Sequence, residues 1–193
     1  MRSFGPPLKD RIAPGVRVLF VGINPGVRSA LTGHHFAGFS NRFWRLLFDS
    51  GLVPEPICFK DDDRLPDWGY GITNIVPRAT PGMTDLTHEE YAAGAAVLWR
   101  KIRKHRPPIV ALVGVTVWRA LLEAVGVPRA RTLPVSLGPQ PRTAIDEVAP
   151  SALPQETLLF VLPNPSGRNA NYSYEEMLAA FRALRRAAHR SGD

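Results

Sequence analysis

The length, composition and charge of this chain exclude several classes of protein. It has 193 residues, 45% of them hydrophobic, which favours one domain with a sizeable core, and its single cysteine, Cys58, excludes an intramolecular disulfide and an all-cysteine metal site. With 24 Lys and Arg against 17 Asp and Glu, the formal net charge is +7, which makes nucleic acid a candidate partner, although an Arg-rich genome would give the same excess.

Neither a membrane span nor a signal segment is expected. No apolar run approaches the roughly 18 residues that cross a bilayer, and the first residues lack the apolar core of a secretory signal. A lone cysteine also fits a reducing compartment. We therefore expect a cytoplasmic protein.

The first half of the chain alternates apolar runs with a helical pattern. Residues 16–23 form a continuous apolar run, typical of a strand buried on both faces of a parallel sheet, and residues 71–76 form a weaker one. Between them, Asn41 can cap a helix whose apolar face starts at Phe43. Residues 54–67, which include three consecutive aspartates, indicate a solvated loop.

The second half continues the alternation. Thr87 and Glu90 form a capping-box pattern for a helix that ends before Pro107. Apolar runs at 109–113 and 157–162 predict two further strands.

Two more helices and one irregular segment complete the pattern. Thr116 is predicted to cap a helix that runs through Val125, and Ser173 with Glu176 predicts the start of the last helix. Residues 127–155 are rich in proline and indicate an irregular insertion with one or two short strands.

Strands that alternate with helices imply a parallel sheet with right-handed crossovers. We therefore expect an α/β fold, a three-layer α/β/α arrangement with a central, mainly parallel sheet. One domain is expected over residues 1–193, with short flexible ends at about 1–12 and 187–193.

Unusual turns follow the first and the last of the strong strands. Residues 22–26 read Gly-Ile-Asn-Pro-Gly, and residues 163–169 read Pro-Asn-Pro-Ser-Gly-Arg-Asn. Ligands of open α/β sheets bind beyond the carboxyl ends of the strands, so both turns are expected at a ligand site. Asn-Pro is also a common turn dipeptide, so either turn alone fits an ordinary loop. Neither turn carries a dinucleotide fingerprint or a phosphate-binding loop.

Together and in this order, the two turns resemble the active-site motifs of the mismatch-specific uracil-DNA and thymine-DNA glycosylases. Segments 32–37, 41–44 and 71–80 are also similar to this family. The resemblance extends from about residue 14 to residue 184. The region 127–155 is longer than the corresponding region of the shortest members of the family. The resemblance implies a uracil-DNA glycosylase-like fold. It also implies a monofunctional base-excision-repair enzyme that flips uracil, or thymine or ethenocytosine, out of duplex DNA where it faces guanine. The enzyme would hydrolyse the N-glycosidic bond and leave an abasic site.

The resemblance assigns roles around the first turn. Asn24 would position the attacking water, and Phe36 would stack on the flipped uracil. Backbone donors around Ile23 and Phe36 would stabilise charge on the leaving base. Ser29 would bind the base or a phosphate, or only structure its loop, and Phe36 taken alone also fits a core position.

The second turn would enter the duplex. Arg168 stands where the family places its wedge and would fill the gap left by the flipped base. Gly167 and Asn169 would offer backbone groups to the widowed guanine, and Asn164 would shape the loop or touch that guanine. Ser166 belongs to the same DNA-binding loop. Taken alone, Arg168 also fits a solvated surface arginine.

An amide such as that of Asn24 can orient water but cannot accept its proton near neutral pH, so an enzyme that depends on it alone should be slow. Asp85 follows the 71–76 run on the expected ligand side of the sheet. We hypothesise that Asp85 assists Asn24 as a base or as an electrostatic stabiliser. The alternative is that it favours the dipole of the helix that follows.

Other polar residues allow weaker interpretations. Arg28, Arg42 and Arg78 are candidate phosphate contacts, which would make binding steeply salt-dependent. His34 and His35 are adjacent and lack convergent partners, so no metal site is expected.

Two rival functions remain open. A non-catalytic DNA-damage-binding module would explain the charge, Phe36 and Arg168 without needing Asn24, and alkali-sensitive breaks in uracil-containing duplex would exclude it. A nucleotide-metabolising enzyme would need a phosphate loop, and a nucleophilic Ser166 would need the strand–elbow–helix signature that its motif lacks. The favoured expectation is a bacterial cytoplasmic hydrolase without cofactor or metal, which acts as a monomer on double-stranded DNA containing G·U or G·T mismatches.

Overall fold

The fold is known from a computed structural model that describes residues 4–147 and 153–190. Its strands form one sheet in the order β2-β1-β3-β5-β4. Four strands pair in parallel, namely β1 (Val18–Gly22), β2 (Tyr70–Asn74), β3 (Ile109–Val113) and β5 (Leu158–Leu162), and β4 (Gly138–Pro139) pairs antiparallel to β5 at the edge. Each predicted apolar run matches one parallel strand to within two residues at either end, so the predicted sheet is confirmed.

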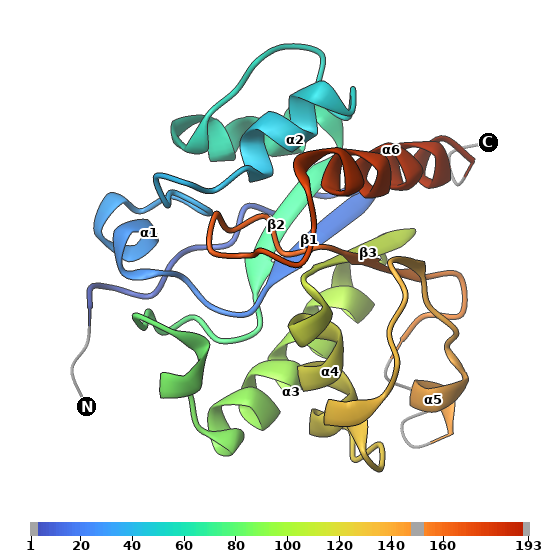
Figure 1. Cartoon of the computed structure of the whole chain (residues 1–193). Coiled ribbons are helices and arrows are strands. Elements are labelled where there is room, and N and C mark those ends of the chain that lie inside the picture. Colours follow the sequence, from blue (N-terminus) through green and yellow to red (C-terminus); the bar gives the residue numbers. More distant parts are fainter. Residues whose placement is uncertain (1–3, 148–152, 191–193) are drawn as a thin grey trace.

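Helices cover both faces of this sheet (Figure 1). α2 (Phe43–Asp49) and α6 (Tyr174–Arg190) pack on one face, and α3 (His88–His105) and α4 (Val115–Ala124) pack on the other. Successive strand residues point to opposite faces, so Phe20 of β1 belongs to the first core, and Leu19 and Val21 belong to the second. The three-layer α/β/α architecture is therefore confirmed. Shorter elements are α1 (Val27–Thr32), α5 (Thr143–Asp146) and the 3-10 turns Phe59–Trp68, Met83–Asp85 and Ala130–Thr132.

Two of the predicted helix starts are built as expected, and a third is shifted by one residue. The Thr87 hydroxyl accepts from the Glu90 amide at 3.3 Å, and the Glu90 carboxylate accepts from the Thr87 amide at 2.9 Å. Ser173 and Glu176 make the same reciprocal pair at 3.2 and 2.7 Å. The side-chain oxygen of Asn41 accepts the first amide hydrogen of α2 at 3.0 Å. Both capping boxes therefore fix where their helices begin, whereas the N-cap of α2 is Arg42 and Asn41 supports the turn one residue before it.

The predicted cap at Thr116 is wrong. α4 begins at Val115, directly after Gly114, and no side chain caps it. Gly114 has φ +123°, a conformation open to glycine, which turns the chain from β3 into the helix within one residue. Thr116 is therefore an exposed residue of the first helical turn.

The solvated loop predicted for residues 54–67 is also wrong in its second half. Residues 59–68 form a 3-10 helix, and Asp62 is fully buried. Its carboxylate accepts from Arg11 Nε at 3.1 Å and from the backbone amide of His35 at 2.9 Å, and it lies 3.0 Å from His34 Nδ1. The sequence gives no sign of which of three adjacent aspartates has distant partners.

The insertion and the chain ends differ in how well they were predicted. Residues 127–155 contain one short strand and one short helix, in line with the irregular insertion expected there, although residues 148–152 lie outside the described part. Near the ends, Arg11 pairs with Ile72, and Ala187 and Ala188 are buried in α6, so the ends are held more closely than expected. Residues 1–3 and 191–193 lie outside the described residues.

Candidate active site

A cleft of about 1130 Å³ opens at the carboxyl ends of the parallel strands. From β1 the chain crosses to β2 on one side of the sheet, and from β3 it crosses to β5 on the other side. This divergence is the topological switch point at which open α/β sheets bind their ligands. The turns 22–26 and 163–169 both contribute to the lining of the cleft, so the fold brings the two motifs together.

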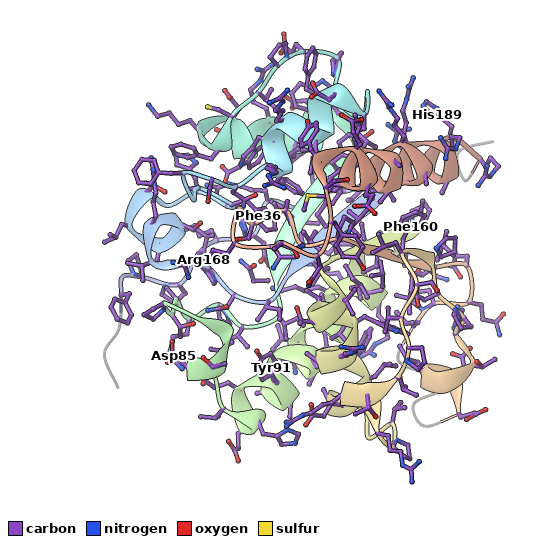
Figure 2. All side chains as sticks on the ribbon, in the orientation of Figure 1. Phe36, Asp85, Tyr91, Phe160, Arg168 and His189 are labelled. Carbon is purple, nitrogen blue, oxygen red and sulfur yellow. The ribbon has the colours of Figure 1, made fainter. Side chains whose placement is uncertain are left out.

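Most of the predicted site residues contribute to this cleft. The lining includes Ile23, Asn24, Ser29, Phe36, Asn164, Ser166, Arg168 and Asn169. Asp85 and Gly167 are the two predicted residues outside it. Figure 2 shows Phe36 and Arg168 on the same side of the molecule, with Asp85 apart from them, before α3.

The Asn24 side chain is held by its amide nitrogen. Nδ2 donates to Thr80 Oγ1 at 2.7 Å and to the carbonyl oxygens of Pro25 and Arg78, each at 3.2 Å. Thr80 Oγ1 in turn donates to the Gly82 carbonyl at 2.6 Å, so the hydroxyl can only accept from Asn24. This network fixes the orientation of the amide and leaves its carbonyl oxygen as the group that can accept a hydrogen bond from a water in the cleft.

For the glycosylase activity that the sequence resemblance implies, replacing Thr80 by valine is expected to slow excision without weakening DNA binding. Valine keeps the volume of this buried side chain but cannot accept the 2.7 Å bond, so the amide loses its strongest anchor. A lost bond of this kind corresponds to about a tenfold loss in single-turnover rate. Thr80→Ser keeps the hydroxyl and serves as the control. Equal rates for the valine and serine variants would show that Thr80 does not orient Asn24.

Phe36 forms one wall of the cleft. Its ring stacks on Phe43, with centroids 4.3 Å apart and planes 27° apart, and Phe43 is fully buried in the core. Phe36 has φ +49°, uncommon for a residue with a side chain. The ring therefore packs against the core on one side and lines the cleft on the other. Both interpretations drawn from the sequence apply, and the site contains a rigid aromatic surface.

Asn74, at the end of β2, is a site residue that the sequence analysis did not single out. A Cβ placed on Gly22 would lie 2.5 Å from Asn74 Oδ1 and 3.4 Å from Phe36 Cζ, so these two side chains converge above the glycine. Asn74 lines the same cleft. The sequence could have indicated Asn74 as a site residue only through its position at the carboxyl end of a strand that lies beside β1. That inference requires the order of the strands in the sheet, which the sequence does not show.

His35 fixes the orientation of Asn74. His35 Nε2 lies 2.9 Å from the Lys9 carbonyl oxygen, so Nε2 carries the proton and donates, and Nδ1 accepts from Asn74 Nδ2 at 3.4 Å. Burial lowers the pKa of His35 below its ordinary value, which favours this neutral form. The Asn74 carbonyl oxygen is then the free acceptor beside Phe36.

Ser29 holds the aromatic wall in place. Its side chain is buried, and Oγ accepts from the Ala37 amide at 3.1 Å, directly after Phe36. Its carbonyl oxygen accepts from the amides of Gly33 and His34 at 2.9 and 3.2 Å. Of the roles expected for Ser29, this geometry favours the loop-structuring one.

The second turn is stabilised largely by its own side chains. Asn164 Oδ1 accepts from the Ser166 amide at 3.0 Å, and Ser166 Oγ accepts from the Arg168 amide at 3.3 Å. Asn169 Nδ2 donates to the Asn164 carbonyl at 2.8 Å. Asn164, Ser166 and Asn169 thus preform the loop that presents the exposed Arg168 at the rim of the cleft.

Gly167 marks the contact between this loop and the segment after Phe36. A Cβ on Gly167 would lie 2.4 Å from the Ser40 side chain, which only a glycine avoids. The Arg42 amide also donates to the Pro165 carbonyl at 2.9 Å. Segments 38–42 and 163–169 are therefore packed side by side.

The charges of the lining all have one sign. Arg28, Arg119 and Arg168 line the cleft, and no described lining residue is an Asp or a Glu. Asp85 is exposed, and its carboxylate accepts from the Gly82 amide at 3.0 Å. A cleft with only positive side chains suits a polyanionic ligand.

The other two arginines considered from the sequence have protein partners. Arg78 donates to both carboxylate oxygens of Glu90, at 2.5 and 2.8 Å, and mainly for this reason the pKa of Glu90 falls to about 2. Arg42 contacts the Met177 sulfur at 3.7 Å. These contacts secure the segment beside Asn24 and the start of α2, and they favour a structural role for both arginines.

The described residues contain neither a group of metal-ligating side chains nor a helix that could cross a membrane. Within residues 4–147 and 153–190, no three His, Cys, Asp or Glu side chains gather where they could hold a metal ion. Over the same residues, none of the helices has the length and apolarity to cross a membrane.

Comparison with known families agrees with this geometry. Residues 10–185 match the family model of the uracil DNA glycosylase superfamily. The match covers most of the 193 residues, and the chain belongs to this superfamily. It is accordingly a DNA-repair hydrolase of the DNA glycosylase class, an enzyme that acts on DNA.

Proposed function

We propose that this glycosylase removes uracil, and more slowly thymine or ethenocytosine, from positions opposite guanine in duplex DNA. The observation that carries the proposal is that Asn24 and Arg168, which are 144 positions apart in the chain, line the same cleft. Phe36 lines this cleft as well. The first turn can position the water that attacks the sugar linkage, while the second turn fills the gap in the base stack. Excision of a base that has been flipped out of a duplex requires both of these actions.

Base flipping is the first step. Extruding a nucleotide costs a few kcal/mol, and less at a mismatch, so G·U and G·T sites open more readily than normal pairs. Arg168 inserts its guanidinium into the vacated space, where the planar group stacks on neighbouring bases and remains close to phosphates. Backbone groups at Gly167 and Asn169 contact the unpaired guanine.

The extruded pyrimidine then lies against Phe36 with Asn74 at its edge. The Asn74 carbonyl oxygen, left free by the bond to His35, accepts the N3–H of uracil, which cytosine lacks. A site built to pair with a substrate N–H discriminates strongly against an analogue without it. This arrangement favours uracil over cytosine.

Hydrolysis uses a water held by the Asn24 carbonyl oxygen. The C1′–N1 bond breaks with its electron pair moving to the base, the water oxygen bonds to C1′, and the water proton is released. Backbone amides around Ile23 and Phe36 stabilise the anionic leaving base. Because none of the described residues that line the cleft carries a carboxylate to accept the proton, we expect slow turnover.

The role of Asp85 in the chemistry stays a prediction. Its carboxylate bonds to the Gly82 amide, and the Gly82 carbonyl accepts from Thr80, the anchor of Asn24. This chain of bonds favours a positioning role, in which Asp85 shapes the turn behind Asn24.

The test of the proposed function is an excision panel. Duplexes with G·U, A·U and G·T and a single strand with uracil are incubated with the protein, treated with alkali and analysed for strand breaks. We expect G·U to be cleaved fastest, G·T more slowly and the single strand slowest. Binding without breaks in any substrate would instead support the non-catalytic module, and equal rates on single strand and G·U would contradict guanine reading by the second turn.

Replacing Arg168 by alanine is expected to lower excision at G·U by about tenfold and to reduce the slope of log binding against log salt by about one unit. The guanidinium supplies both the wedge and one phosphate-neutralising charge. Arg186→Ala removes an equal charge from the exposed side of α6 and is the matched control. If both variants lose the same activity, net charge alone explains the effect and the wedge assignment fails.

A further inference from the structure

Phe39 is the most exposed large apolar residue of the described part of the chain, with 93% of the residue accessible to solvent. A single exposed apolar residue is ordinary on a protein surface. Phe39 differs from the others because it lies in a short turn, 38–40, between the aromatic wall and the second Asn-Pro turn, and because it lines the cleft.

A cation supports one face of this ring. The Arg28 guanidinium carbon lies 3.2 Å from the centroid of Phe39 and 5.3 Å from that of Phe59, so the guanidinium is held between two rings. Arg28 Nη1 is buried with no hydrogen-bond partner among the described residues. Arg28 covers one face of the ring, and because the residue as a whole is 93% exposed, the other face of Phe39 is open to solvent.

The segment that carries Phe39 also packs against the loop that carries Arg168. Its neighbour Ser40 lies against Gly167, as the 2.4 Å approach of a Cβ placed on Gly167 shows, and Arg168 follows directly. Phe39 and Arg168 line the same cleft. A duplex that receives Arg168 in its stack would therefore lie close to the segment that carries Phe39.

We propose that Phe39 is a second DNA-contacting residue, on which a base next to the extruded nucleotide stacks while Arg28 beneath the ring attracts the adjoining phosphate. This inference rests on the proposed function for the placement of the duplex. An aromatic ring backed by a guanidinium presents an apolar face and a positive charge together, which suits a nucleotide and few other ligands. Stacking of one base on an aromatic side chain corresponds to about a 5- to 150-fold gain in affinity.

The test measures binding separately from cleavage. The probe is a G·U duplex whose deoxyuridine carries a 2′-fluorine, which destabilises positive charge on the sugar and so resists hydrolysis, with 2-aminopurine beside the lesion as a fluorescent reporter. Phe39→Ala is expected to bind about tenfold more weakly with an unchanged salt slope, and to abolish the reporter change. Phe39→Trp should retain both, and Arg28→Ala should lower the salt slope.

Leu31→Ala is the matched control, because Leu31 is also a large exposed apolar residue, at 72%, and does not line the cleft. Binding of Phe39→Ala within twofold of Leu31→Ala, or an unaltered reporter signal, overturns the proposal. Failure of the wild type to excise uracil would remove the proposed function and leave the binding comparison to decide the role of Phe39. Normal excision with no effect of Phe39→Ala would remove only this inference.

Discussion

Replacing Asn24 by alanine is expected to lower the single-turnover rate of uracil excision by about 100-fold or more, with binding to a G·U duplex little changed. In the proposed mechanism the Asn24 amide orients the attacking water, and loss of a positioned reactant corresponds to at least this factor. Three bonds from Nδ2 hold it in place, to Thr80, Pro25 and Arg78. The rate is measured with enzyme in excess over a labelled duplex.

The comparison with Asp85→Ala decides between a water-positioning amide and an amide–carboxylate pair. Asp85 lies outside the cleft lining and bonds to Gly82, so its removal should slow excision by less than about fivefold, through the turn alone. Melting temperatures of both variants show whether the turn has loosened. A loss for Asp85→Ala as large as that for Asn24→Ala would place the carboxylate in the chemistry.

Most of the fold could be predicted from the sequence, because the patterns that mark strands and helix starts involve residues close together in the chain. Continuous apolar runs mark the parallel strands, and the capping boxes at Thr87 and Ser173 mark helix starts through bonds that span three residues. Thr116 shows the limit of this reasoning. A glycine with a positive φ can precede a helix that no side chain caps. The sequence alone does not indicate whether a helix begins at a capping side chain or directly after such a glycine.

The site was predicted less completely, because part of it depends on distant contacts. The two Asn-Pro turns carry recognisable motifs, and eight residues predicted around them reach the cleft. Asn74 gave no such signal, because its role arises from strand order and from His35, 39 positions away. The buried carboxylate of Asp62 is similarly paired with Arg11, 51 positions away, and with His34. Residues whose function is set by long-range partners are those that sequence reasoning overlooks.

Gly22→Ala tests the convergence of Phe36 and Asn74 directly. The added methyl group would lie 2.5 Å from Asn74 Oδ1, the end of a flexible side chain, so Asn74 must turn away while the strand remains intact. We expect a melting temperature close to that of the wild type and an excision rate about 10- to 100-fold lower, which corresponds to the loss of the hydrogen bonds that read the base. The loss should match that of Asn74→Ala.

The matched control is Gly26→Ala, which adds the same methyl group in the same turn. A Cβ on Gly26 meets nothing within 4 Å, and its φ of −69° suits alanine, so excision should stay within about threefold of the wild type. The double variant Gly22→Ala, Asn74→Ala completes a cycle. If the glycine acts only by displacing Asn74, the double variant is no slower than either single variant, because residues in one network are not additive. Additive losses would mean instead that the methyl group obstructs the pyrimidine itself against Phe36, and the reading of the base would then depend on shape more than on the Asn74 amide.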